Sequence, residues 1–239
     1  MEVQSERQRQ ATSNDLVLDL NEITVRELNN TLRGLDDGAN VTIENPRGQH
    51  SICVGQLKKL NVTVNGHAGY FLGGLCDGPS IHVNGSVGVA AGENLMQGII
   101  RVTGNASSNA GATAHGGTLI IEGNASSRCG ISLKGGDIVV AGDIGHMSAF
   151  MAQAGTMLIG GDAGDALGDS LYEAVIYVAG NISSFGADAR EEDMTEADVQ
   201  KVKELIELSG FDHIDPENVK RVASAKTLYN FDALKGQSY

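Results

Sequence analysis

The sequence predicts an all-β protein, a single-stranded parallel β-helix of about 19 residues per coil with short α-helical extensions at both ends. Two observations predict this fold: a glycine recurs every 19 residues, and a short β-branched or aliphatic stretch precedes each copy. The marker glycines are Gly66, Gly85, Gly104, Gly123, Gly142, Gly161 and Gly180. A period of 19 residues is too short for a pair of helices, whereas it suits one coil of a solenoid that stacks its strands on the next coil.

The first expected region, residues 1–40, is an extension with one strand and a capping helix. Apolar residues at 16–18 predict the strand. Thr24 and Glu27 have the spacing of a capping box, in which each side chain satisfies a backbone N–H at the start of a helix. We expect this helix to run to about Leu35 and to cover one open end of the solenoid.

The second expected region, residues 41–190, is the β-helix itself. The first and third positions of each strand are apolar, as Val62 and Val64 show in the first regular coil. Alternate residues of a strand lie on the same face, so these positions predict the interior. A looser first coil is expected around residues 41–43.

Residues at the same position of successive repeats stack into a column, and three further columns predict how each coil turns. The second residue after each marker glycine is apolar and predicts a second inward column: Ala68, Val87, Ala106, Ala125, Ile144, Ala163 and Ile182. The seventh is always small, which predicts a sharp bend or a close approach of two backbones: Gly73, Gly92, Gly111, Gly130, Ala149, Gly168 and Ala187. In five coils the residue directly after the marker is a turn former that can hydrogen-bond from coil to coil: Asn105, Asn124, Asp143, Asp162 and Asn181.

The third expected region, residues 191–239, is a helical tail. Thr195 predicts the start of a helix that ends at Gly210. Its apolar residues recur at helical spacing: Val199, Val202, Leu205, Ile206 and Leu208. Asp215-Pro216 predicts a second helix start, and the final segment, including residues 227–231, carries aromatic residues without a regular period.

The middle position of each strand is expected to face outward. It is polar in the first three regular coils and apolar in the next four, which contribute Ile120, Val139, Leu158 and Tyr177. Four stacked apolar side chains in contact with water would form a patch that soluble monomers rarely carry. We therefore expect either the C-terminal helix or another subunit to cover this column, and these four residues are the candidate partner interface.

The chain carries no spacing typical of a catalytic or metal site. No two of its six histidines share a column of the repeat, so they cannot form a ladder of metal ligands. The three cysteines, Cys53, Cys76 and Cys129, fall outside any C-x-x-C pattern. Lys134-Gly135-Gly136 imitates a phosphate loop but precedes no helix. We expect no catalytic, cofactor-binding or metal-ligating residue in this chain.

Composition excludes several classes of protein. With 17 Lys and Arg against 30 Asp and Glu, the net charge is −13, so we expect no nucleic-acid partner. The 32 glycines come with only 3 prolines, which excludes collagen. No apolar run approaches the roughly 18 residues of a membrane-spanning helix, so we expect no membrane partner. The polar start MEVQSERQRQATSND and the scattered cysteines favour the cytoplasm.

The glycine-marked coils resemble a known family, the Gly-rich β-helix domain at the C-terminal end of the glutamate synthase large subunit. The resemblance lies in VNGHAGYFLGGLCDGPSIHVNGSVGVAAGENLMQGIIRVTG, followed by GGTLIIEGNAS and GGDIVVAGDIG. The same module resembles a subunit of formylmethanofuran dehydrogenase. The resemblance covers about residues 41–190 and implies a right-handed coil with a structural role.

The flanks DLNEITVRELNNTLRGL and ASAKTLYNFDALKGQSY resemble the stand-alone β-helix subunit of N-methylglutamate synthase. This resemblance implies a non-catalytic subunit of a complex that converts methylamine and L-glutamate to N-methyl-L-glutamate and ammonia. Its implied partners are a class II amidotransferase-like subunit and a synthase-like subunit. FMN and an iron–sulfur cluster are expected in the synthase-like partner, and no cofactor is expected in this chain.

Three alternatives remain open from the sequence. The chain could be a stand-alone glutamate synthase β-helix subunit, or a β-helix subunit of the formylmethanofuran dehydrogenase type. It could also be an independent enzyme or ligand-binding solenoid, with a groove between the coils and the tail. In that third case the isolated chain would show activity or saturable binding of a small ligand.

Overall fold

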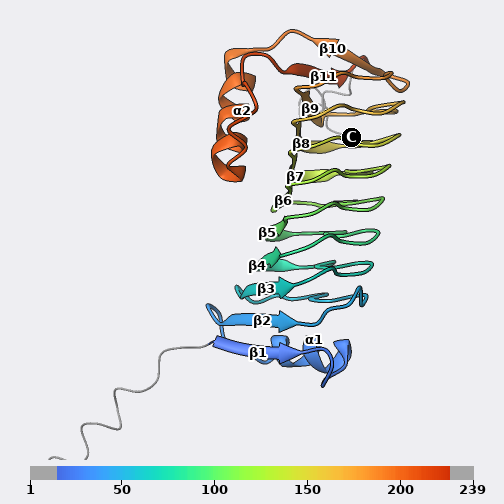
Figure 1. Ribbon diagram of the computed structural model, residues 1–239. Helices are drawn as coiled ribbons and strands as arrows, with labels where there is room; N and C mark the ends of the chain where they lie inside the picture. The colour runs from blue at the N-terminus through green and yellow to red at the C-terminus, as the bar shows by residue number, and fades with distance from the viewer. Residues whose placement is uncertain (1–14, 227–239) are drawn as a thin grey trace, which may run out of the picture.

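The computed structural model describes residues 15–226, which form a β-solenoid of stacked coils (Figure 1). Its strands are β1 (Asp15–Asp19), β2 (Asn40–Glu44), β3 (Asn61–Asn65), β4 (Asp77–Val83), β5 (Gln97–Val102), β6 (Thr118–Ile121), β7 (Lys134–Val140), β8 (Ala154–Ile159), β9 (Val175–Val178), β10 (Ala189–Glu192) and β11 (Lys220–Ser224). They form one 11-stranded sheet in the order β1-β2-β3-β4-β5-β6-β7-β8-β9-β11-β10. Neighbours from β1 to β9 pair in parallel, which confirms the predicted parallel β-helix.

The strands stack in the register of the sequence repeat. Val41 pairs with Val62, and Val62 pairs with Ile81, so the looser first coil predicted around residues 41–43 is confirmed as β2. Ile81 and Val83 are at most 1% exposed, because the first and third strand positions point into the core. The second inward column is stacked as well, by parallel bridges that run from Ala68 to Ile182.

An arc with left-handed residues at alternate positions completes each coil that begins with one of the strands β2 to β8. In one coil these residues are Phe71, Gly73 and Leu75, with φ values of 62°, 63° and 59°. The N–H groups of Phe71 and Leu75 donate to the next coil, whereas that of Gly73 donates to the preceding coil. A Cβ on Gly73 would lie 2.6 Å from Ile100 Cδ1. The bend and the close approach predicted for this small-residue column are therefore both present here.

The turn residues after the marker glycines hydrogen-bond from coil to coil, as predicted. The ladder runs from side chain to backbone: Asn105 Oδ1 accepts the N–H of Asn124 at 2.8 Å, and Asn124 Oδ1 accepts that of Asp143 at 2.9 Å. The complete series of acceptors is His67, Ser86, Asn105, Asn124, Asp143 and Asp162. Each exposed corner thus satisfies a backbone donor of the coil that follows it.

A helix closes the first coil. The helix α1 (Val25–Arg33) begins with the capping box predicted for Thr24 and Glu27. It places Leu28 and Leu32 against the core, where both are fully buried. The predicted capping helix is therefore present, and its apolar side fills the open end of the solenoid (Figure 1).

A second helix, α2 (Glu196–Ser209), follows the last coil. It begins at Thr195 and ends at Gly210, whose φ of 74° is the left-handed conformation that glycine adopts without strain. Both predicted ends are confirmed. Within residues 15–226, neither helix combines the length and the apolar character that crossing a bilayer would require.

The chain then returns to the sheet, which the sequence did not predict. The strand β11 inserts between β9 and β10 and pairs antiparallel with both. The helix expected from Asp215-Pro216 is wrong: these residues form a turn closed by a hydrogen bond from Asn218 N to Asp215 O. The Asp215 carboxylate accepts from Glu217 and Asn218 and so stabilises the turn. The aromatic segment at residues 227–231 lies outside the described residues.

Candidate functional site

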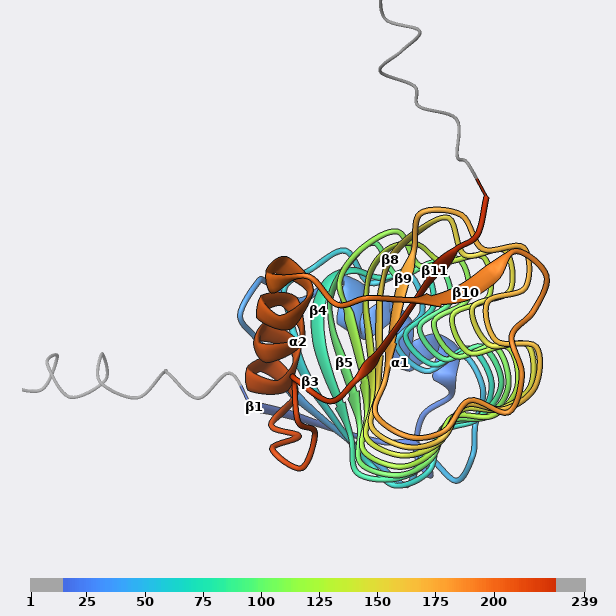
Figure 2. The same ribbon diagram turned by 90° about the horizontal axis from the view of Figure 1, so that it is seen from above.

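The outward apolar column is buried beneath the C-terminal segment. Ile120, Val139, Leu158 and Tyr177 are between 0% and 3% exposed. Their cluster includes apolar residues of α2 and of the segment after it: Val202, Leu205, Phe211, Ile214 and Val219. Figures 1 and 2 show α2 alongside the sheet, outside the coil. Of the two covers that the sequence left open, the structure shows the C-terminal helix.

This burial bears on the candidate interface at the same four residues. Their side chains contact α2 and its following segment, so a partner could reach them only after α2 moved away. A partner interface at these residues therefore stays a prediction. The surface that this part of the chain presents is the outer face of α2.

Asp198 connects the first turn of α2 to the sheet. Its Oδ2 accepts the N–H and the hydroxyl of Thr195 at 2.9 and 2.6 Å. Its Oδ1 accepts the Tyr177 hydroxyl at 2.5 Å and Arg221 Nε at 3.1 Å, and Arg221 also pairs with Glu192. Burial alone would raise the pKa of Asp198, but the hydrogen bonds from Thr195 and Tyr177 outweigh it and lower the pKa to about 2. Asp198 is therefore ionised at neutral pH and links helix, sheet and β11.

Two further cations hold α2 along its length. Lys201 Nζ lies 3.0 Å from the carboxylate of Asp137, which precedes the apolar part of β7. Arg101 donates to Ser209 O at 3.0 Å, and its Nε lies 2.6 Å from Glu122 Oε1. A cation at the C-terminal end of a helix is stabilised by the unpaired carbonyls there. Arg101 occupies the middle position of its strand, which the repeat predicts to face outward, but no pattern in the sequence indicates this contact.

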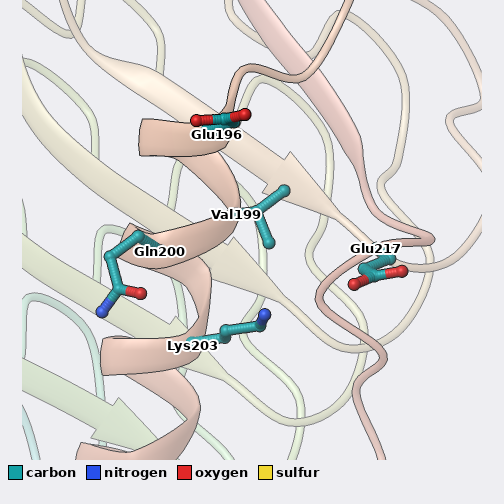
Figure 3. A pocket seen from close by; sticks show the side chains of 5 residues that line it. All are labelled: Glu196, Val199, Gln200, Lys203 and Glu217. Carbon is teal, nitrogen blue, oxygen red and sulfur yellow. The ribbon is translucent and has the colours of Figure 1, made fainter.

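The outer face of α2 has a shallow depression of about 460 Å³. Its lining consists of Glu196, Val199, Gln200, Lys203 and Glu217. Figure 3 shows Val199 and Lys203 directed toward the loop that carries Glu217, whereas Gln200 points away. The depression is open to solvent and mixes charges of both signs, so its geometry does not define a reaction centre.

The three cysteines are buried in the core. Burial raises the pKa of Cys129 to about 12 and that of Cys76 to about 11, so both thiols stay protonated at neutral pH and lack the nucleophilic thiolate form. Cys76 Sγ also donates to Cys53 O at 2.9 Å. Among the residues of the described range, no three His, Cys, Asp or Glu side chains gather closely enough to hold a metal ion.

The glycines of Lys134-Gly135-Gly136 have a packing role. Lys134 begins β7, and its side chain is exposed. A Cβ on Gly135 would lie 2.2 Å from His115 O, and one on Gly136 would lie 2.6 Å from Gly117 O. Both glycines are therefore required by the close stacking of neighbouring backbones.

Comparison with known proteins finds similarity both to a curated sequence and to solved structures. No family model matches the chain. The chain is 54% identical over 226 residues to Protein GlxC of Rhizobium meliloti (strain 1021), covering 93% of this chain and 99% of that protein. A chain from the crystal structure of the formyltransferase/hydrolase complex of Methylorubrum extorquens with methylofuran superposes with a TM-score of 0.57. At 17% identity, covering 90% of this chain and 96% of that one, it shows the fold alone.

Proposed function

The chain belongs to the GlxC family, and on this premise we propose that it is a non-catalytic structural subunit of a multi-subunit enzyme complex. Residues 41–190 would be the spacer, while residues 1–40 and 191–239 would close its ends and carry contacts to partners. The observation that carries the proposal is the continuous stack of coils, whose interior is filled by one apolar cluster from Leu20 to Val222. Such a rod is suited to hold other polypeptides at a set spacing.

The structural neighbour supports the same proposal from a different direction. It is a chain of a formyltransferase/hydrolase complex, and it has this fold over most of its length. A solenoid of this kind thus occurs inside an assembly that carries catalysis. The fold itself implies no reaction, because function resides in sites that are added to folds.

For the reaction, we propose an N-methylglutamate synthase-type complex in the cytoplasm. Support comes from the resemblance of both flanks to the stand-alone β-helix subunit of that enzyme. The partners would be a class II amidotransferase-like subunit and a synthase-like subunit that binds FMN and an iron–sulfur cluster. The complex would join methylamine to L-glutamate and release ammonia, and this chain would hold the two partners together.

A second candidate is a subunit of the formylmethanofuran dehydrogenase type. The structural match to a chain from a complex crystallised with methylofuran favours this candidate. Such an assembly would contain tungsten or molybdenum, whereas an N-methylglutamate synthase-type assembly would contain FMN. The bound cofactor therefore distinguishes the two.

The test is purification of the tagged full-length chain from its native source. We expect two larger partners to co-purify, one of them yellow from bound FMN, and we expect methylamine-dependent glutamate turnover by the complex alone. A stand-alone glutamate synthase subunit would support turnover with ammonia from glutamine instead. Recovery of a monomer without partners, or turnover by the isolated chain, would contradict the proposed function.

A further inference from the structure

Among the described residues, the first strand, β1, has an open edge. Within residues 15–226 it pairs only with β2, and it is the lowest strand of the rod in Figure 1. Leu20 N donates to Glu44 O, so the even-numbered residues direct their backbone groups toward β2. Because these groups alternate along a strand, the N–H and C=O of Val17 point to the open edge. The Val17 side chain is also 63% exposed.

The side chains above this edge form a directed ladder. Asn61 Nδ2 donates to Asn40 Oδ1 at 3.0 Å, and Asn40 Nδ2 donates to Asp15 Oδ1 at 2.9 Å. Each side chain donates to the layer below, and the ladder ends on a carboxylate, which can only accept when ionised. A residue that continued this column below Asp15 would therefore have to be a donor.

At the other end of β1, a carboxylate is again the last acceptor of the side-chain hydrogen bonds. Asn45 Nδ2 donates to Asp19 Oδ1 at 2.9 Å, and Asn21 N donates to the same oxygen at 2.8 Å. Asp15 and Asp19 thus lie on either side of Val17, on the same face of the strand. Four residues of an extended strand separate the two carboxylates by about 13 Å. A strand laid along β1 would meet an acceptor, an apolar side chain and a second acceptor, in that order.

We propose that β1 docks an extended segment of a partner subunit in which one apolar residue lies between two basic residues, at positions i, i+2 and i+4. The segment adds a strand to the sheet through the backbone groups of Val17. Its two basic side chains donate charge-assisted hydrogen bonds to Asp15 and Asp19. The inference rests on the proposed role as a complex subunit and assigns the chemistry of one partner contact.

The same charges disfavour a second copy of this chain as the occupant. Two copies paired antiparallel about Val17 would place Asp15 of one strand opposite Asp19 of the other, twice in the symmetric dimer. Like charges directly opposite one another destabilise a strand pair. The carboxylates therefore protect the edge from self-association while leaving it open to a basic strand.

The test uses the full-length chain and two fluorescent peptides whose cores are Lys-Thr-Val-Thr-Lys and Glu-Thr-Val-Thr-Glu. We expect the lysine peptide to bind at least tenfold more tightly at low salt, and the double substitution Asp15→Lys, Asp19→Lys to reverse this preference. Val17→Pro removes the N–H directed at the open edge, so it should weaken binding at least tenfold. Val17→Thr keeps that N–H and is the matched control, expected to bind as the unaltered chain does.

Equal binding of both peptides, or dimerisation of the chain through β1, would overturn the inference. Unchanged binding by a folded Val17→Pro chain would do the same. If Val17→Pro does not fold, the charge-reversal result decides alone. Native co-purification separates this inference from the proposed function: partners that all remain on the Val17→Pro chain refute the docking edge only. Absence of any partner from the unaltered chain refutes the function, while the peptide measurement still decides the chemistry of the edge.

Discussion

The hydroxyl of Tyr177 donates a hydrogen bond of 2.5 Å to Asp198 Oδ1, and this bond joins β9 to the first turn of α2. Burial and the contact with Asp198 raise the pKa of Tyr177 well above its usual value, so the hydroxyl remains a donor. Asp198 also completes the capping box with Thr195. One carboxylate therefore both starts the helix and fastens it over the apolar column.

Removing this hydroxyl should weaken the attachment of α2. We expect Tyr177→Phe to lower the free energy of unfolding by about 1.5–3 kcal/mol, because a buried bond to a charged acceptor is lost. The matched control is Tyr172→Phe, since Tyr172 is 50% exposed and should change little. Chemical denaturation of both variants and of the unaltered chain measures the free energies of unfolding to be compared. Equal stability of both would show that the bond contributes nothing.

The carboxylate of Asp198 should make stability depend on acid pH. Its pKa is about 2 in the folded chain against an ordinary value of 3.8, so its contribution is present above pH 3.8 and is lost as the pH falls through about 2. The difference corresponds to about 2 kcal/mol. Asp198→Asn should remove this part of the pH dependence. Unfolding curves measured between neutral and acid pH test it, and parallel pH profiles of the two proteins would refute it.

A charge beneath α2 should detach the helix or unfold the chain. We expect Leu158→Lys to cost more than about 3 kcal/mol, because Leu158 is 0% exposed and an unpaired ammonium would be buried there. Thr63→Lys is the control at the same position of an uncovered strand, where we expect a change within about 0.5 kcal/mol. Thermal unfolding and limited proteolysis between residues 193 and 220 report the outcome. Resistance of the Leu158→Lys chain equal to that of the control would argue against burial.

The marker glycines should tolerate no methyl group. A Cβ on Gly85 would lie 2.7 Å from the carbonyl carbon of Gly66, so Gly85→Ala must force two coils apart. We expect a cost of at least about 3 kcal/mol. Gly38 has a φ of +83°, and a Cβ added there would meet no atom within 4 Å, so Gly38→Ala tests conformational strain alone. That strain should cost about 1 kcal/mol. A similar cost for both substitutions would exclude close stacking as the cause.

The solenoid could be predicted because its determinants are local and repeated. The 19-residue glycine period and the alternation seen at Val62 and Val64 specify both the coil and its interior. The left-handed conformations of Phe71 and Leu75 could not be predicted in this way, because isolated bulky residues avoid them. Hydrogen bonds to neighbouring coils impose that conformation, and they exist only once the coils have stacked.

The candidate site was predictable only in outline. The apolar column from Ile120 to Tyr177 showed that a cover was needed, and the helical spacing after Thr195 supplied a candidate for it. The insertion of β11 between β9 and β10 depends on pairing across more than 40 residues, which no local pattern encodes. The contacts of Arg101 with Ser209 and of Arg221 with Asp198 likewise join segments that only the folded chain brings together, so the sequence alone did not reveal them.

The ladder that begins at His67 and ends at Asp162 repeats once per coil, since each corner side chain accepts a hydrogen bond from a backbone N–H of the following coil. Rod length can therefore change only in steps of one layer, about 4.8 Å each. A coil added between β1 and β5 would leave α2 and its contacts in place. A coil added between β5 and β7 would change the spacing between Arg101 and Asp137, which contact Ser209 and Lys201 of α2, so the helix would no longer fit both. The number of coils can therefore vary in the part of the rod that α2 does not cover, whereas it is fixed in the part that α2 spans.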